Sequence, residues 1–462
     1  VSLLAIAAAA TIPPAGAAVR ALHFPVVCPP GCLWPQRLRR LARVAVAAMK
    51  ELAFVGGLLL IIPAMFAAVG FRGREQVVGI DLGTTFSVVA LKSKDKVTVI
   101  PDYGTGKLLV PSVVSFLSNG SNIVGDEAVN RRSGYPLQTV FNAKRFIGRK
   151  LGEVEQDAKS HPYRVAANSS VGPGTDIQEA DAGFSIPGDD PVDRWMSPMD
   201  VGAQVVLRLK RSIAEYLGYP IYRTVICVPA KFESRQIKAT QQAFELAGFK
   251  VMRILEEPTA AAVAYNLHKT SGVRHVLVYD IGGGTLDTSL LYMNGKSVNV
   301  LGVAGDDHLG GSDFDRRMLQ LLEGKLAGAQ KVAQPQQALQ RCDSNGLAIA
   351  AEEAKIKLSS QDSLEVHCLA DDGEARSLPV TRQEFESASA DLFDRSMEPV
   401  RKVLADQMMS AENVDDVVLV GGASRTPKLR VLLQEFMGPT KRLHTEIDPD
   451  ITVAYGAANI LD

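Results

Sequence analysis

The sequence predicts an α/β protein of two related lobes, each with one glycine turn directed at a ligand between them. The first observation is segment 275–293, HVLVYDIGGGTLDTSLLYM, which reads as an apolar strand, a three-glycine turn and a second apolar strand. The second is segment 77–92, VVGIDLGTTFSVVALK, which repeats this pattern about 200 residues earlier. A period of that length is too long for a solenoid, so it indicates two related lobes.

The glycine turn of 275–293 has the composition of a phosphate-binding loop. Gly282, Gly283 and Gly284 have no Cβ atoms, so their backbone N–H groups can approach an anion closely. Asp280 and Asp287 flank the turn, as a magnesium ion that bridges phosphates would require. An ordinary hairpin with a glycine-rich turn is the alternative. The second hairpin favours a polyphosphate that is held from both sides.

Length, charge and the first cysteines limit the classes of protein. A chain of 462 residues is long enough for two or three domain-sized units. The net charge of −1 gives no basic surface of the kind that nucleic-acid-binding proteins carry, so nucleic acid is not an expected partner. Cys28 and Cys32 frame the motif CPPGC, but no second pair follows at the spacing of a zinc site.

The N-terminal part differs from the rest in composition. Residues 1–48 form a low-complexity leader rich in alanine and proline, which we expect to be disordered or a gene-model artefact with Met49 as the true start. Residues 49–74 read as a signal peptide or a signal anchor, because the apolar run 52–71 is interrupted by a single proline and followed by two arginines. A buried core helix is the alternative. A targeting segment would bring the body of the chain into the secretory pathway.

Two glycosylation sequons, at Asn119 and Asn168, would be usable in that pathway. The cysteines outside the leader are odd in number and widely scattered, so they imply no disulfide framework. They are Cys227, Cys342 and Cys368. Cys227 falls in an apolar strand and reads as a core residue.

The first half of the body alternates strands and helices. Lys144 lies in an otherwise apolar turn, where it is either a phosphate ligand or a solvated residue. An amphipathic helix is expected over 201–217 and a buried strand over 224–230. Glu257 directly precedes a helix whose first turn holds Pro258, so this carboxylate either positions magnesium-bound water or caps the helix.

The second half continues with a helix over 348–358 that carries Glu352 and Lys355. Ser359 follows one turn later. These three side chains form either an edge that contacts a ribose or a solvated, salt-bridged helix face.

Three further elements are expected near the C-terminus. Segment 363–380 reads as a hairpin, and a capping box at Thr381 begins one helix that ends near Met409. Segment 417–427, VVLVGGASRTP, is a third strand that leads into a glycine turn and then a helix. Its paired glycines would let a flat ring lie on the backbone.

Together these motifs resemble the nucleotide-binding domain of the seventy-kilodalton heat-shock chaperones, members of the actin, hexokinase and sugar-kinase superfamily. The matching motifs are IDLGTT, AKRFIG, EEPTAAA, DIGGGTLD and VGGASRTP, in the family's order and spacing. The resemblance runs from about Val77 to the end of the chain. It implies a two-lobed actin/hexokinase-like ATPase fold, each lobe a mixed β-sheet with flanking helices, with ATP or ADP and Mg²⁺ in the central cleft.

The resemblance also implies roles for individual residues. Phosphates would be cradled by Gly83, Thr84, Thr85, Gly282, Gly283 and Gly284. The catalytic residues would be Lys144, Glu257, Asp280, Thr285 and Asp287. The metal would be held through water by Asp81, Asp280 and Glu257. The adenosine would be held by Glu352, Lys355, Ser359, Gly421, Gly422 and Arg425. Pro229 would relay the nucleotide state.

The chain departs from the family pattern at three positions. Ile356 stands where many members stack an arginine on the adenine, so a cation–π contribution of about 1 kcal/mol would be lost. Ile237 stands where an arginine usually follows the relay proline. This departure counts against the coupling to a partner domain that the family pattern implies. Ala423 replaces the usual serine of the third glycine turn.

The resemblance divides the body into lobe I, residues 76–270 with 444–462, and lobe II, residues 271–443. No hydrophobic linker or peptide-binding domain follows in this sequence, which resembles the microsomal, ATPase-core-only branch of the family. That branch implies the endoplasmic reticulum lumen or the luminal side of the microsomal membrane, with the membrane reached only through an uncleaved N-terminal segment. A clipped full-length chaperone is the alternative.

The expected function is slow, Mg²⁺-dependent and peptide-independent hydrolysis of ATP. A nucleotide-gated regulatory module with negligible turnover is the alternative from another class, and a sugar kinase is a distant third. The resemblance implies nucleotide as the ligand and nucleotide-exchange or J-type co-chaperones as partners.

Overall fold

The structure is a computed structural model that describes residues 76–94, 96–167, 176–188, 193–295, 297–332 and 340–460, together with Ile61. The leader, the apolar run apart from Ile61, the CPPGC motif and the sequon at Asn168 lie outside the described residues. No helix in the described part of the chain is both long and apolar enough to cross a membrane. Residues Glu75–Asp462 form one compact unit.

Lobe I is built on a mixed sheet with the strand order β12-β11-β1-β2-β3. Strand β1 pairs antiparallel with β2 and parallel with β11, so the predicted hairpin of 77–92 forms the middle of the sheet. Short strand β4 adds to β2. The strands are β1 (Val77–Leu82), β2 (Phe86–Ser93), β3 (Lys96–Val99), β4 (Val110–Pro111), β11 (Arg223–Val228) and β12 (Lys250–Glu256).

Helix α4 (Pro198–Leu217) confirms the amphipathic helix expected over 201–217. It begins three residues earlier because Ser197 caps it: the Ser197 hydroxyl accepts a hydrogen bond from the Asp200 backbone N–H. It ends at Gly218, whose φ of 74° is the left-handed conformation that glycine adopts most readily. Helix α5 (Ser234–Leu246) packs beside α4.

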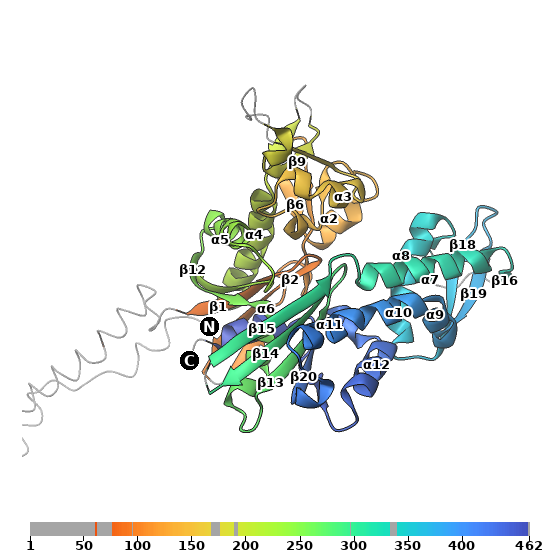
Figure 1. The fold of residues 1–462 in the computed structure, drawn as a ribbon. Coiled ribbons are helices and arrows are strands. Elements are labelled where there is room, and N and C mark those ends of the chain that lie inside the picture. The colour runs from red at the N-terminus through yellow and green to blue at the C-terminus, as the bar shows by residue number, and fades with distance from the viewer. Residues whose placement is uncertain are drawn as a thin grey trace, which may run out of the picture. The chain divides into compact units, whose positions relative to one another are not determined.

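A separate part of lobe I carries two three-stranded sheets, with the orders β6-β5-β7 and β10-β9-β8. Figure 1 shows this part, with α2, α3, β6 and β9, beyond α4 at the top of the view. Its strands are β5 (Val114–Phe116), β6 (Asn122–Val124), β7 (Thr139–Val140), β8 (Arg164–Ala167), β9 (Ala182–Ile186) and β10 (Arg194–Met196). Its helices are α2 (Asp126–Arg131), η2 (Ala143–Arg145), η3 (Leu151–Glu153), α3 (Glu155–Lys159) and η4 (Ile177–Glu179).

Lobe II repeats the plan of lobe I with the strand order β15-β14-β13-β20-β21. Strand β13 pairs antiparallel with β14 and parallel with β20, as β1 does with β2 and β11. The register places Asp280 directly opposite Asp287 across the hairpin. This repeated arrangement confirms the two related lobes. The strands are β13 (His275–Ile281), β14 (Leu286–Asn294), β15 (Ser297–Asp306), β20 (Asp416–Val420) and β21 (Arg442–His444).

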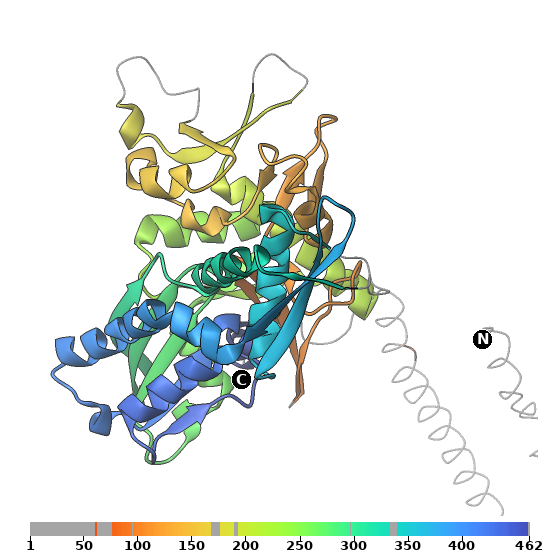
Figure 2. The ribbon, with the colours of Figure 1, turned by 90° about the vertical axis from the view of Figure 1, so that its right-hand side faces the viewer.

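The rest of lobe II holds helices α7 (Gly311–Leu326) and α8 (Ser344–Leu358), which pack against each other, and a sheet of order β16-β19-β18-β17. The predicted hairpin of 363–380 is confirmed as β18 (Ser363–Leu369) and β19 (Ala375–Thr381). Figure 2, viewed from the α8 side, shows this hairpin in front. The remaining elements are β16 (Gln330–Val332), β17 (Gln340–Arg341), η6 (Ala411–Asn413), η7 (Gly422–Arg425) and α12 (Pro427–Met437).

The single helix expected from Thr381 to near Met409 is wrong, although its capping box is present. The segment forms three helices: α9 (Arg382–Ala388), α10 (Ala390–Ser396) and α11 (Glu398–Asp406). Pro399 explains the second break, because proline has no N–H to donate and is tolerated only in the first turn of a helix.

A disulfide joins Cys342 to Cys368, so the expectation that the scattered cysteines imply no disulfide was wrong. The two residues are 26 positions apart, but β17 returns to lie parallel to β18, with Gln340 opposite Cys368. This pairing is a long-range feature that spacing did not reveal. Cys227 is free and buried, in agreement with a core role.

Helices α6 (Glu257–Ala264) and α13 (Thr452–Asn459) pack against each other where the two lobes meet. A Cβ atom on Gly456 would collide with the backbone of Ala260, and one on Gly79 would collide with the backbone of α13. Small residues therefore allow these elements to approach closely. Helix α13, near the end of the described chain, also contacts strands β1 and β2 of the lobe I sheet.

Candidate functional site

The two predicted phosphate turns touch each other where the lobes meet. A Cβ atom on Gly283 would clash with the side chain of Thr85, so the turn of lobe II lies directly against the turn of lobe I. The start of α7 closes over the lobe II turn, because Gly311 donates its N–H to the Gly282 carbonyl at 2.9 Å and Ser312 donates to Gly283 at 2.8 Å. The structure thus brings both glycine turns to one place.

Arg145 is a second link between the lobes at this turn. Its guanidinium donates to the Gly284 carbonyl at 2.6 Å and to the Asp307 carbonyl at 2.7 Å, and it also pairs with Asp157 at 3.3 Å. These bonds hold the lobe II turn against 3₁₀ helix η2 of lobe I. Arg145 was not among the predicted site residues, although its place beside Lys144 in AKRFIG was a usable signal.

Lys144 lies within the site rather than in solvent, so the solvated alternative is wrong. Its Nζ is 2.6 Å from Glu257 Oε1, and the two side chains are only 9% and 14% exposed. Burial lowers the pKa of the Lys144 ammonium, but the negative charges of Glu257 and Asp81 outweigh burial and leave that pKa above its usual value. Lys144 is therefore a charged residue at neutral pH.

Glu257 is the first residue of α6, whose N-cap position is Glu256. The carboxylate of Glu257 pairs with Lys144 rather than capping the helix by a side-chain hydrogen bond. The helix begins here because Pro258 suits its first turn.

Two buried carboxylates complete the cluster. The pKa of Asp81 is raised to about 7, chiefly by burial, with the charge of Lys144 opposing the rise and the charge of Glu257 adding to it. Burial also raises the pKa of Asp280, and so do the nearby charges of Glu257, Asp287 and Asp81. These raised pKa values show that the positive charge of Lys144 does not balance burial and the mutual repulsion of the neighbouring carboxylates.

This charge imbalance suits a divalent cation. Oδ1 of Asp81 is buried and has no hydrogen-bond partner among the described residues, which leaves it free to accept a bond from metal-bound water. Nowhere in the described ranges do three or more His, Cys, Asp or Glu side chains gather closely enough to hold a metal directly. The donor set therefore fits Mg²⁺, which binds oxygen ligands and usually keeps several of its waters.

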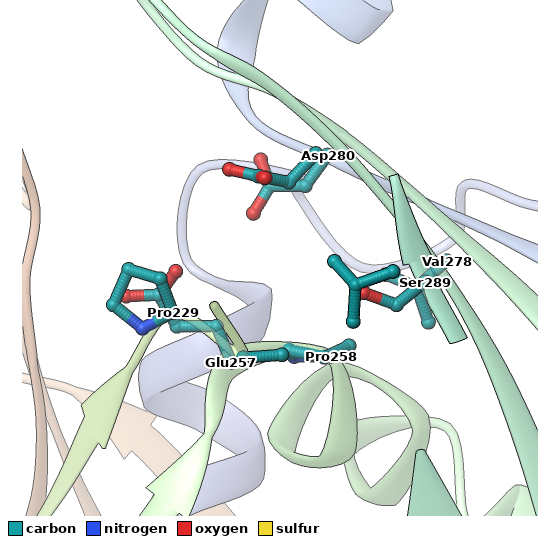
Figure 3. A pocket seen from close by; sticks show the side chains of 9 residues that line it. Pro229, Glu257, Pro258, Val278, Asp280 and Ser289 are labelled. Carbon is teal, nitrogen blue, oxygen red and sulfur yellow. The ribbon is translucent and has the colours of Figure 1, made fainter. Parts of the chain in front are cut away.

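A pocket opens beside the carboxylates, between β11, α6 and the strands of lobe II. It is lined by Pro229, Ala230, Glu257, Pro258, Val278, Asp280, Asp287, Ser289 and Val303. Figure 3 shows Asp280 across this pocket from Pro229 and Glu257. The pocket thus joins the predicted relay proline to three of the predicted catalytic residues.

Sequence reasoning missed Lys231 of lobe I, which forms an ion pair with Asp287, one of the residues that line this pocket. Its Nζ lies 2.9 Å from Asp287 Oδ1 in lobe II and 3.9 Å from Asp307 Oδ1. The only signal in the sequence was its position two residues after Pro229.

Of the predicted adenosine residues, Lys355 lies beside the start of α7. Lys355 on α8 forms an ion pair with Asp315 at 2.7 Å and donates a hydrogen bond to the Gly311 carbonyl at 3.1 Å. A Cβ atom on Gly311 would lie 3.7 Å from the Cβ of Ala423, so α7, α8 and η7 converge there. Ile356 is 60% exposed on the next position of α8. This convergence brings Lys355 near the third glycine turn.

The other predicted adenosine residues are less closely connected. Arg425 pairs with Asp448 and, at 3.2 Å, with Asp450, whose carboxylate also lies against Gly422. Across the described residues, no hydrogen bond or ion pair joins Arg425 to α8. The Ser359 hydroxyl donates to the Lys355 carbonyl, at 3.4 Å.

Comparison with known proteins agrees with this arrangement. The family model described as Hsp70 protein matches residues 77–461. Chaperone protein dnaK of Cyanidioschyzon merolae is 39% identical over 390 residues, which cover 83% of this chain and 61% of that protein. Heat shock 70 kDa protein BIP3 of Oryza sativa subsp. japonica is 39% identical over 410 residues, 87% of this chain and 58% of that protein. The chain spans about three fifths of the length of these relatives.

Proposed function

The chain belongs to the Hsp70 family, and we propose from this that it binds ATP with Mg²⁺ between its two glycine turns and hydrolyses it slowly to ADP and phosphate. The observation that carries the proposal is the buried Lys144–Glu257 pair beside Asp81 and Asp280, at the point where the turns of both lobes touch. Hydrolysis of ATP depends chiefly on positioning and charge neutralisation, which is what these groups provide.

The residues divide into three roles in this proposal. Backbone N–H groups of the two turns cradle the phosphates, and the Lys144 ammonium neutralises the terminal phosphate. Asp81, Asp280 and Glu257 hold the water shell of Mg²⁺, and Asp287 with Thr285 orients the attacking water. When bound, Mg²⁺ would supply positive charge that offsets the developing charge on the phosphate oxygens.

The adenosine is assigned to the convergence of α7, α8 and η7. Lys355 and Glu352 on α8 would contact the ribose together with Ser359, and Gly421 and Gly422 would let the base lie on the backbone. Ile356 offers the base an apolar contact and no cation–π interaction. We therefore expect weaker adenine binding than an arginine at this position would give.

Three features support a luminal location in the secretory pathway. Segment 49–74 has the composition of a signal sequence or anchor. The Cys342–Cys368 disulfide belongs to an oxidising compartment. Asn119 lies on an exposed turn between β5 and β6, where its sequon is accessible.

A nucleotide-gated regulatory module is the second candidate. Ile237 and Ile356 leave room for it, because both stand where the family usually has an arginine. Such a module would bind nucleotide and change partners, among which nucleotide-exchange or J-type co-chaperones are proposed, without appreciable turnover.

Phosphate release by the full chain separates these candidates. We expect slow release from ATP with Mg²⁺ and no added peptide, and no release after the metal is removed with EDTA. Tight ATP binding with no phosphate release in either condition would favour the regulatory module and contradict the ATPase proposal.

A further inference from the structure

Lys231 brings a second ammonium group to the carboxylate cluster. It follows β11 in lobe I and forms an ion pair with Asp287 on β14 of lobe II, at 2.9 Å. Its side chain is 35% exposed, and its partner Asp287 lines the pocket together with its chain neighbours Pro229 and Ala230. The pair therefore links the two lobes at the edge of the phosphate site.

Gly305 on β15 provides the space for this lysine. A Cβ atom at position 305 would collide with Lys231 Nζ and would lie 2.8 Å from Asp287 Oδ1. Asp307, two residues further on, adds a second carboxylate at 3.9 Å from the ammonium. The cation thus lies near two carboxylates of lobe II, Asp287 on β14 and Asp307 directly after β15, and is not an isolated surface residue.

We propose that Lys231 binds the terminal phosphate of ATP and thereby distinguishes ATP from ADP at the proposed site. The inference rests on the proposed ATP-binding function and adds a residue that the predicted set did not contain. The ammonium then contacts both Asp287 and the terminal phosphate. Its weaker pairing with Asp287 leaves that carboxylate able to orient the attacking water.

Charge balance supports this assignment over a purely structural ion pair. The cluster has four carboxylates, Asp81, Glu257, Asp280 and Asp287, and Lys144 already pairs with Glu257. A terminal phosphate adds further negative charge at the same place, where a second flexible cation is stabilising. ADP has no such phosphate and does not need this cation.

The test compares two affinities in the full chain, for ADP and for a non-hydrolysable ATP analogue, both with Mg²⁺ and measured by calorimetry. In Lys231→Met we expect affinity for the analogue to fall about tenfold, the cost of one charge-assisted hydrogen bond, while affinity for ADP stays unchanged. Lys231→Arg, which keeps the charge, should recover most of the loss. Lys238→Met is the matched control, because Lys238 is an exposed lysine of α5 with no ion pair among the described residues.

Each outcome tests either the role of Lys231 or the proposed function of the chain. Equal affinities of wild type and Lys231→Met for the analogue, or an equal loss for both nucleotides in a folded variant, would overturn the role of Lys231. If Lys231→Met fails to fold by circular dichroism, Lys231→Gln is judged by the same ratio of affinities. A wild-type chain that binds neither nucleotide would instead refute the proposed function.

Discussion

At the scale of single residues, buried ion pairs hold loops of the chain in place. The best connected is Asp102, which is 4% exposed and accepts two bonds from the Arg208 guanidinium, at 2.7 and 2.9 Å. It also accepts from the backbone N–H and the hydroxyl of Thr105, both at 3.0 Å. Burial opposes ionisation of Asp102, but these bonds outweigh it and lower its pKa to about 2. The loop after β3 is thereby fastened to α4.

Asp102→Asn should lower the free energy of unfolding by about 2 kcal/mol at neutral pH, because the carboxylate loses its charged partner. Urea denaturation checks this value. Asp126→Asn is the matched control, since its pair with Lys107 has side chains that are 29% and 63% exposed and should contribute less than about 1 kcal/mol.

The effect of Asp102 should also depend on pH in a defined direction. Its folded pKa lies below the unfolded value of 3.8, so its stabilisation is complete well above that value and is lost as the pH falls toward 2. The gap in unfolding free energy between wild type and Asp102→Asn should therefore shrink as the pH is lowered from about 6 to about 3. A gap that stays constant over this range would contradict the assigned pair.

At the scale of elements, the disulfide fixes the start of α8 to β18. Cys368 is fully buried in the core of lobe II, and Cys342 directly precedes the helix that carries Lys355. The bridge thus fastens the predicted adenosine helix to the neighbouring sheet.

The double variant Cys342→Ser, Cys368→Ser should lose about 3 kcal/mol of unfolding free energy, because the cross-link restricts the unfolded chain. Wild type in dithiothreitol should fall to the same stability, and the double variant should not respond to the reductant. Cys227→Ser serves as the control and should keep the response. Two free thiols at positions 342 and 368 by mass spectrometry under non-reducing conditions would refute the bridge.

The elements also show how far the sequence could predict the fold and the site. Both glycine hairpins, α4 and the third glycine turn follow from local patterns of apolar residues and glycines, and the structure contains all of them. The breaks between α9, α10 and α11 were missed because the capping signal at Thr381 marks where a helix begins and not where it ends. The fold class was therefore predictable, and the helix boundaries less so.

The residues of the site also divide into those that could be predicted from the sequence and those that could not. Lys144, Glu257 and Asp280 lie within recognisable motifs, so they could be selected from the sequence. Arg145 could have been selected from its place beside Lys144 in AKRFIG, but its contacts and those of Lys231 could not, because no local pattern encodes which carboxylate or carbonyl of the other lobe a side chain will meet. The disulfide was missed for the same reason.

At the scale of the whole molecule, the secretory assignment makes one accessible prediction. Asn119 is exposed on a turn of the described chain, so it should be glycosylated if the body enters the endoplasmic reticulum. A glycosidase should then reduce the apparent mass of the protein from cells, and Asn119→Gln should reduce or remove that shift. An unmodified Asn119 together with fractionation into the cytosol would refute the luminal location.

The central claim is that the cluster at the junction of the lobes is an ATPase site in which Lys144 neutralises the terminal phosphate. The most direct test is single-turnover phosphate release from ATP with Mg²⁺ by wild type and by Lys144→Ala, with ADP affinity measured in both. The matched control is Lys150→Ala, because the ion pair of Lys150 with Asp181 has side chains that are 33% and 76% exposed. We predict that Lys144→Ala lowers the rate at least about a hundredfold while it still binds ADP, and that the control keeps the wild-type rate. An unchanged rate in Lys144→Ala would contradict the account.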